Sequence, residues 1–158
     1  MFNVVLVEPE IPPNTGNIGR LCLATGSVLH LIEPLGFDIN DKQLRRAGLD
    51  YWSEVQIRTW KTLDELQRAQ ATSARYFFLT TKSNRPYFDI QFLPNDFLVF
   101  GRETKGLPES LLDANRSSTL TIPMQNTRSL NLATAVAIVL FEAVRQQRVG
   151  FGGPAPAK

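Results

Sequence analysis

Short runs of β-branched, aliphatic or aromatic residues alternate with helical patterns along most of this chain. The runs cover residues 3–7, 28–33, 55–60, 76–81, 97–101 and 120–123. Most are apolar at successive positions, as NVVLV (3–7) is, which is typical of strands buried on both faces of a covered, largely parallel sheet. Helical patterns cover residues 17–26, 41–47, 62–70 and 108–113, and a long closing helix covers 131–147. The alternation predicts an α/β fold with a mostly parallel sheet flanked by helices.

The size and composition of the chain indicate one ordinary globular unit. Its 158 residues are 43% hydrophobic and 20% charged, so we expect one domain over residues 1–150 and a mobile tail rich in Gly and Pro over 151–158. No apolar run has the ~18 residues of a membrane span, and the first residues lack signal-peptide features. We therefore expect a cytoplasmic protein without membrane contact.

The single cysteine and the single histidine limit the chemistry that the chain can perform. Cys22 has no intramolecular disulfide partner, and with His30 it cannot complete a zinc cluster, so we expect no metal. Cys22 lies in the apolar pattern LCLA and is interpreted as a buried structural thiol. His30 alternates with apolar neighbours in VLHLIE and is interpreted as a half-buried strand residue. The segment GRETKG (101–106) has Walker A glycine spacing, but Leu107 stands where lysine is required.

Polar loops follow three of the predicted strands. They are EPEIPPNTGNIGR (8–20), GRETKGLP (101–108) and IPMQNTRSLNLA (122–133). In open α/β sheets, ligands bind at the carboxyl ends of the strands, so these loops could form one site. Their Gly, Asn, Ser and Arg residues favour main-chain and amide hydrogen bonding over paired acids and bases. The net charge of +2 permits nucleic-acid binding without requiring it, and a scattered basic surface remains an alternative.

The same three loops closely resemble the motifs of the SPOUT superfamily of methyltransferases, and within it the small tRNA wobble-ribose 2'-O-methyltransferases. NTGNIGR resembles the first motif, FGRETKGLP the second and IPMQNTRSLNLATAV the third. The similarity also includes HLIEPLGF, DKQLRRAGLDY and FFLTTK, and it covers nearly all of residues 3–147. The resemblance implies an enzyme that transfers a methyl group from S-adenosylmethionine to the 2'-hydroxyl of nucleotide 34 of tRNA, a cytidine or modified uridine, and releases S-adenosylhomocysteine.

The resemblance further implies a homodimer and a deep trefoil knot in the C-terminal part of the fold. Topological rules for ordinary folds would not predict a knot. By position, five residues match those that bind the methyl donor in the family: Leu79, Gly101, Ile122, Ser129 and Leu130. Glycine at 101 and 106 is expected where the backbone closely approaches an adenine or ribose. We expect the dimer to form through the closing helix and the first-motif helix, because residues 132–144 have a wide apolar surface.

Arg20 matches the arginine that the family places at the target hydroxyl, reaching across the dimer. A guanidinium stays protonated, which favours stabilising the alkoxide and phosphate, with proton abstraction as the rival role. A surface ion pair with Glu8 or Glu10 is the structural alternative. Asn14, Ser129 and Asn131 are further catalytic candidates, although Asn14 could serve a turn and Ser129 or Asn131 could cap the closing helix. Glu103 is expected to fix the second loop by accepting main-chain hydrogen bonds.

Basic residues beside the predicted site are candidates for tRNA binding. These are Arg45, Arg46, Lys82 and Arg128. The first two could instead only solvate their helix.

Three residues differ from the usual family pattern: Arg102 replaces a common proline, Leu130 a methionine and Phe141 a tyrosine. Two other functions remain open, namely 2'-O-methylation of another RNA such as rRNA, and a catalytically silent RNA-binding module.

Overall fold

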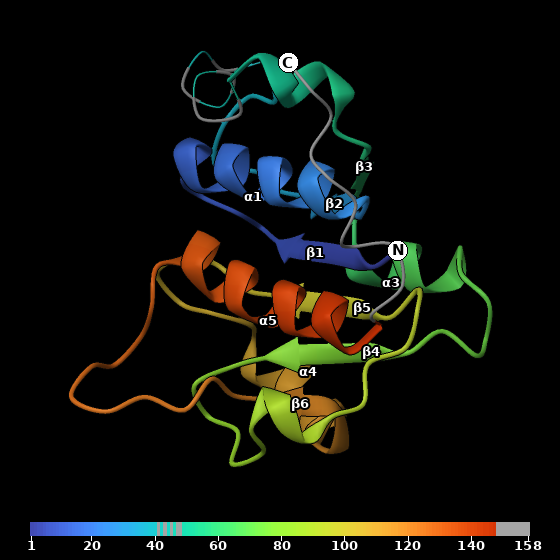
Figure 1. The fold of residues 1–158 in the computed structure, drawn as a ribbon, viewed down its shortest axis with the longest axis vertical. Coiled ribbons are helices and arrows are strands. Elements are labelled where there is room, and N and C mark those ends of the chain that lie inside the picture. The colour runs from blue at the N-terminus through green and yellow to red at the C-terminus, as the bar shows by residue number, and fades with distance from the viewer. Residues whose placement is uncertain (41, 43, 45, 47–48, 148–158) are drawn as a thin grey trace.

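A six-stranded parallel sheet forms the centre of the molecule (Figure 1). The computed structural model describes residues 1–40, 42, 44, 46 and 49–147. The strands are β1 (Asn3–Val7), β2 (Val28–Ile32), β3 (Ile57–Trp60), β4 (Tyr76–Leu79), β5 (Phe97–Phe100) and β6 (Thr119–Leu120). Their order is β3-β2-β1-β5-β4-β6, and they pair in parallel. The predicted α/β fold with a parallel sheet is confirmed.

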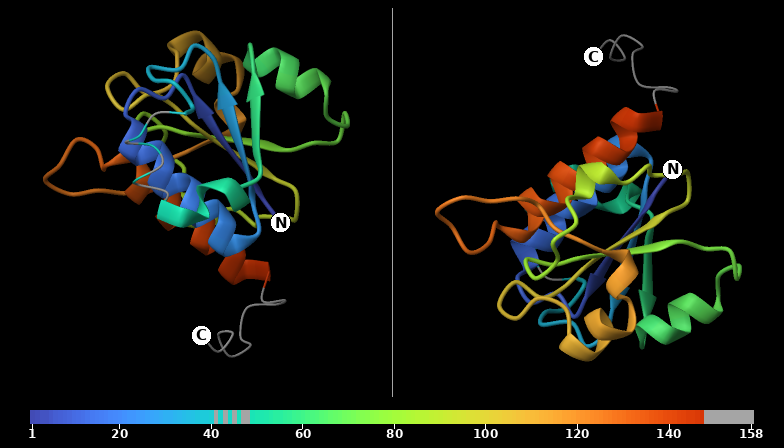
Figure 2. Two further views of the ribbon diagram at one scale, coloured as in Figure 1. Left: turned by 90° about the horizontal axis from the view of Figure 1, so that it is seen from above. Right: turned by 90° about the horizontal axis from the view of Figure 1, so that it is seen from below.

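Helices cover both faces of this sheet. They are α1 (Pro12–Thr25), α3 (Leu63–Arg68), α4 (Glu109–Ala114) and α5 (Leu132–Gln147), with short 3-10 segments η1 (Leu49–Glu54), η2 (Tyr87–Asp89) and η3 (Arg116–Ser118). Figure 2 shows α1 and α5 side by side on one face, with α3 and α4 on the other. Within the predicted helix 41–47, the described residues 42, 44 and 46 are helical. Arg45 and the predicted tail 151–158 lie outside the described residues.

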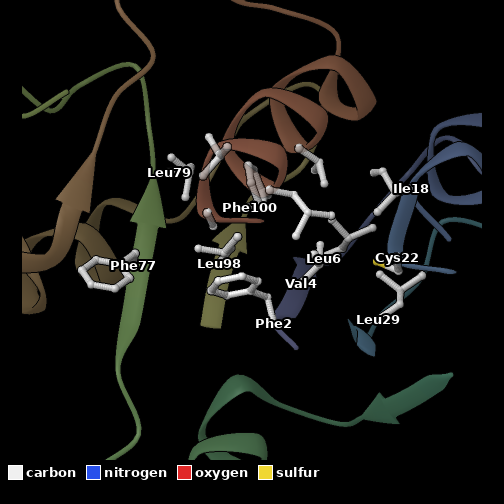
Figure 3. Packing of buried hydrophobic residues seen from close by; sticks show 14 of the residues in the cluster. Phe2, Val4, Leu6, Ile18, Cys22, Leu29, Phe77, Leu79, Leu98 and Phe100 are labelled. Atoms are coloured by element: carbon white, nitrogen blue, oxygen red, sulfur yellow. The ribbon is translucent and has the colours of Figure 1, made fainter. Parts of the chain in front are cut away.

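Alternate residues of the strands supply two separate apolar cores. Val4 and Leu6 of β1 belong to the core beneath α1 and α5, where Figure 3 shows them beside Ile18 and Leu98. Val5 and Val7 belong to the second core, on the opposite face. Because successive side chains of a strand point to opposite faces, a strand covered on both sides must be apolar throughout. This explains why the strands have no polar face in the sequence.

The first helix begins five residues earlier than expected, at Pro12 instead of residue 17. The prolines at 12 and 13 occupy the first turn, where a missing N–H costs no intrahelical hydrogen bond. The helix ends at Gly26, whose φ of 64° is left-handed and whose N–H donates to the carbonyl of Leu23 at 3.2 Å. The early start brings Asn14 into the first turn of the helix.

The segment between β6 and α5 leaves the sheet and projects from the molecule (Figures 1 and 2). The predicted strand 120–123 is shorter than expected, because after Leu120 only Thr121 keeps an isolated bridge, to Pro86. The chain then returns to α5, which packs against α1 and β5. Within the described ranges, no helix is long and apolar enough to cross a membrane.

Candidate functional site

A pocket of about 510 Å³ lies at the carboxyl ends of β4 and β5. Its volume is within the range of roughly 300–1,000 Å³ that small-molecule and cofactor sites occupy. Its walls come from segments far apart in the sequence: the start of α1, residues 79–82, residues 100–107, residues 121, 122, 124 and 129–132, and Ala135 of α5. The three polar loops therefore meet at one edge of the sheet, as their placement after strands predicts.

Every residue predicted to bind the methyl donor lines this pocket: Leu79, Gly101, Ile122, Ser129 and Leu130. Asn14, Asn131 and Lys82 line it as well. Arg20, Arg46 and Arg128 do not line it, and all three are exposed. The structure thus brings together the candidates for donor binding with Asn14, Asn131 and Lys82, and leaves Arg20 outside the pocket of its own chain.

The second-motif loop folds back on itself so tightly that only glycine fits at 101. A Cβ on Gly101 would lie 2.1 Å from the carbonyl carbon of Gly106. Gly106 has a φ of 66°, a conformation that side chains disfavour. The loop closes through the N–H of Gly106, which donates to the carbonyl of Arg102 at 3.0 Å. We expected a ligand to exclude these side chains, whereas the backbone of the loop itself requires both glycines.

Two glutamates join the first loop to the second, in an arrangement that we call the carboxylate latch (Glu10, Glu103 and Thr104). Glu103 accepts hydrogen bonds from the backbone N–H groups of Glu10 at 2.9 Å and Ile11 at 3.1 Å. In return, Glu10 accepts from the backbone N–H of Thr104 at 3.2 Å and from its hydroxyl at 2.9 Å. Glu103 therefore accepts main-chain hydrogen bonds as expected, and their donors belong to the first loop. Its carboxylate also lies at the N-terminus of α1, where negative charge is favourable.

The two asparagines extend this connection to the third motif. Asn14 donates to Glu103 at 3.4 Å and accepts from the side-chain amide of Asn131 at 3.0 Å. The Oδ1 of Asn131 accepts from the backbone N–H groups of Ala133 at 2.9 Å and Thr134 at 3.3 Å, which caps the N-terminus of α5. Asn131 therefore has the capping role that we considered. Asn14 is buried within the same network rather than serving a simple turn.

Arg20 projects from the exposed side of α1. Its guanidinium lies over the ring of Tyr51, with 5.6 Å between Cζ and the ring centroid. The two glutamates that were its possible ion-pair partners are otherwise engaged, Glu8 by Arg102 and Glu10 by Thr104. The structural alternative of an Arg20 pair with either glutamate is therefore not found among the described side chains.

Some residues of the site were not identified from the sequence. Glu10, Thr104 and Tyr51 lie within the matched segments, but their residue types do not indicate which distant group they contact. The sequence marks Arg102 only as a replacement for a common proline and does not predict its ion pair with Glu8. A pattern of residue types signals local structure, and these contacts join positions far apart in the chain.

His30 and Cys22 are both buried, and burial favours the neutral form of each side chain. Trp60 donates to Nδ1 of His30 at 3.0 Å, so Nε2 carries the proton and donates to Oδ1 of Asn3, also at 3.0 Å. Burial, and secondarily the charge of Arg58, lowers the pKa of His30 from 6.5 to about 4. Burial raises the pKa of the Cys22 thiol to about 12. The interpretation of Cys22 as a structural thiol is confirmed, while His30 is fully buried instead of half-buried.

Comparison with known proteins identifies the family. Residues 1–141 match the model of the SpoU rRNA Methylase family. A protein of Burkholderia pseudomallei (strain 1106a), named tRNA (cytidine(34)-2'-O)-methyltransferase, is 51% identical over 158 residues, which cover 98% of this chain and 100% of that protein.

Two solved structures share the fold. One, described as "Structural insights into the 2-OH methylation of C/U34 on tRNA", has a TM-score of 0.89 and 43% identity over 93% of this chain and 96% of that one. The other is the SpoU methyltransferase AviRb from Streptomyces viridochromogenes in complex with AdoMet, with a TM-score of 0.82 and 27% identity over 94% of this chain and 58% of that one. The extent of these matches confirms the resemblance seen in the sequence motifs. The chain belongs to the SpoU rRNA methylase family of methyltransferases.

Proposed function

We propose that this protein methylates the ribose 2'-hydroxyl of nucleotide 34, the wobble nucleotide of tRNA, a cytidine or modified uridine, with S-adenosylmethionine as the methyl donor. The observation that carries the proposal is the convergence of the second- and third-motif residues on one pocket. Full-length similarity to a tRNA (cytidine(34)-2'-O)-methyltransferase supports tRNA over rRNA as the substrate. The pocket also argues against a catalytically silent RNA-binding module.

The pocket has the chemistry to hold the donor, which supplies an electrophilic methyl group when bound. Leu79, Phe100 and Leu107 provide an apolar wall for the adenine. The main chain at Gly101, Ile122 and Leu130 would hydrogen-bond the donor, because these positions line the pocket without large polar side chains. Ser129 lies on the projecting segment and would contact the reacting end of the donor or the ribose. The product S-adenosylhomocysteine would leave by the same opening.

Arg20 serves the acceptor in this proposal. A ribose hydroxyl becomes a good nucleophile only as its proton passes to solvent water, so a fixed positive charge beside the oxygen lowers the barrier to methyl transfer. A guanidinium stays protonated, and we therefore assign it to alkoxide and phosphate stabilisation instead of proton abstraction. Asn14 and Asn131 hold the pocket wall next to α1, and thereby orient the ribose relative to the donor.

We further propose a homodimer, in which Arg20 of each copy reaches the pocket of the other. Arg20 is exposed and does not line its own pocket, so a second copy would complete the site. The outer face of α5 supports this, since Phe141 is exposed there beside the half-buried Ile138.

We also propose that the segment between β6 and α5 threads into a trefoil knot. The return of the chain from the sheet edge at β6 to the middle of the sheet supports it.

For tRNA, we propose a basic surface formed by Arg45, Arg46, Lys82 and Arg128. Arg46, Lys82 and Arg128 are exposed, and Lys82 also pairs with Glu109. Arg45 lies outside the described residues. Arginine and lysine side chains of this kind contact phosphates and position an RNA without reading its sequence.

We also propose that the enzyme acts in the cytoplasm, where its substrate tRNA is found. We propose that residues 1–150 form its single domain.

The test incubates purified protein and S-adenosylmethionine with unmodified tRNA and, separately, with unmodified ribosomal RNA, and then maps the 2'-O-methyl groups. We expect one new mark at nucleotide 34 and none on ribosomal RNA. Arg20→Ala should lose transfer by at least about 100-fold while donor affinity, measured by calorimetry, stays within about twofold. A mark elsewhere would overturn the proposed substrate. Equal loss of donor binding and transfer would show that Arg20 does not act on the acceptor alone.

A further inference from the structure

The short segment η1 is packed onto α1 at Gly19, where a side chain would have to displace the indole of Trp52. A Cβ on Gly19 would lie 2.6 Å from Cζ3 of Trp52 and 3.6 Å from Cγ1 of Val55. The first distance is far inside van der Waals contact, so the indole can rest on the helix only because residue 19 has no side chain. This packing places the residue before Trp52, Tyr51, next to the residue after Gly19, Arg20.

The ring of Tyr51 is in cation–π contact with Arg20. The distance of 5.6 Å from Cζ to the ring centroid is within the limit of about 6 Å for an attractive interaction. The tyrosine is 46% exposed, and its ring contributes little to either apolar core. A large aromatic side chain held at the surface beside an exposed arginine is therefore not explained by packing.

The chemical nature of the group that contacts Arg20 determines whether the guanidinium N–H groups stay available. A carboxylate would occupy the guanidinium N–H groups and neutralise the charge. Among the described side chains, none forms an ion pair with Arg20, and Glu8 and Glu10 are bound to Arg102 and Thr104. A ring face attracts the cation electrostatically and uses no N–H donor. Arg20 can thus be oriented while its donors stay available for an oxyanion.

We propose that Tyr51 is a positioning residue for Arg20, whose ring aims the guanidinium at the acceptor ribose and its phosphate. The proposal rests on the proposed function, in which Arg20 stabilises charge on the RNA. It predicts that the aromatic ring matters and that the phenolic hydroxyl does not. It also predicts that Tyr51 acts only through Arg20.

The experiment compares Tyr51→Phe with Tyr51→Leu under saturating tRNA and donor. Tyr51→Leu should lower kcat by about three- to tenfold, because an exposed cation–π contact is weak but misorientation of a catalytic group is costly. The donor Kd, the KM for tRNA and the unfolding midpoint should remain as in the parent protein. Tyr51→Phe should restore kcat. Phe88→Leu is the matched control, since Phe88 is also an exposed aromatic residue on a 3-10 segment, and it should have no effect.

A double-mutant cycle with Arg20→Ala then separates a direct from an indirect role. If Tyr51 acts through Arg20, adding Tyr51→Leu to Arg20→Ala should not reduce single-turnover rates further. A raised KM for tRNA with unchanged kcat would overturn the proposal and identify a base-stacking residue instead. Equal losses in the presence and absence of Arg20 would also overturn it.

A readout without catalysis separates this proposal from the proposed function. The 15Nε–Hε order parameter of Arg20 should fall in Tyr51→Leu and be kept in Tyr51→Phe, whatever reaction the protein performs. An order parameter unaffected by loss of the ring would refute positioning. An enzyme that ordered Arg20 as expected but placed no mark at nucleotide 34 would refute only the proposed function.

Discussion

Burial changes the pKa of His30 strongly, although this residue has no place in the proposed site. Its ring is 1% exposed and is held between the indole N–H of Trp60 and the amide oxygen of Asn3. Arg58 is its register partner on β3. Protonation would place a second donor against the indole N–H and a second positive charge near Arg58. The folded protein therefore favours the neutral form of the His30 ring.

The stability of the protein should depend on the protonation of His30. Because its pKa is lowered from 6.5 to about 4 in the folded protein, the unfolded chain binds more protons between these values. The contribution to stability is then complete above about pH 6.5 and is lost as pH falls through this window. Linkage converts the shift to about 3 kcal/mol at most. Urea unfolding at a series of pH values measures it.

The control variant for this prediction is His30→Gln, which cannot titrate. It should be less stable at neutral pH, and its unfolding free energy should vary less between about pH 6.5 and about pH 4 than that of the parent protein. If the two proteins lost stability in parallel over that window, the acid sensitivity would come from other groups and not from His30.

Among the elements, the carboxylate latch connects the two loops and the two helices that surround the pocket. Glu103 bonds the backbone just before α1, and Asn14 and Asn131 continue the connection to the first turn of α5. Each of these contacts is made by a side chain and not by the backbone pairing of a strand or a helix. The sheet brings the loops to the same edge, and the latch fixes their relative position.

Glu103→Ala should weaken both the fold and the donor site. Hydrogen bonds to a charged group stabilise more than neutral ones, so we expect a loss of about 1–3 kcal/mol in unfolding free energy. Donor affinity should fall as well, because residues 102–107 form one wall of the pocket. Denaturant unfolding and calorimetric titration with S-adenosylmethionine measure the two effects.

A carboxylate elsewhere on the surface provides the comparison for Glu103. Asp113 forms an exposed ion pair with Arg116 on α4 and η3 and does not line the pocket. Asp113→Ala should change stability by no more than about 0.5 kcal/mol and leave donor binding intact. If a Glu103→Ala protein bound the donor as tightly as the parent protein does, the loops would keep their positions without the carboxylate latch.

At the scale of the whole molecule, the face formed by α1 and α5 decides whether one chain is sufficient to form the complete proposed site. Both helices pack on the same side of the sheet, and Arg20 and Phe141 are exposed on them. The proposed donor-binding residues of a single chain all line one pocket, whereas the proposed acceptor residue Arg20 does not line it. A dimer through this face would account for both observations.

Sedimentation at micromolar concentration should therefore give the mass of a dimer. Phe141→Arg should weaken association by at least about tenfold, because the new charge would be buried in the interface. Phe88→Arg places the same charge at another exposed aromatic residue and should not alter the mass. A monomeric parent protein would contradict the proposed dimer and the shared site with it.

The sequence by itself determined the secondary structure of the sheet and the class of the fold, because the apolar runs and helical periods are properties of neighbouring residues. NVVLV at 3–7 indicates a strand buried on both faces whatever lies beside it. Motif spacing also identified the residues that line the pocket, since Gly101 and Ser129 occupy positions shared with a known family. The start of α1 was misplaced because prolines 12 and 13 indicate a loop unless they occupy the first turn.

Only the tertiary structure decided how these parts act on one another. The order of the strands, the bond from Ile11 to Glu103, 92 residues apart, and the ring beneath Arg20 depend on which distant segments meet. Glu8 or Glu10 could have paired with Arg20, and the sequence does not distinguish such an ion pair from the contact with Tyr51. Packing selects one of them, because Gly19 admits Trp52 and so brings Tyr51, rather than a carboxylate, to the arginine.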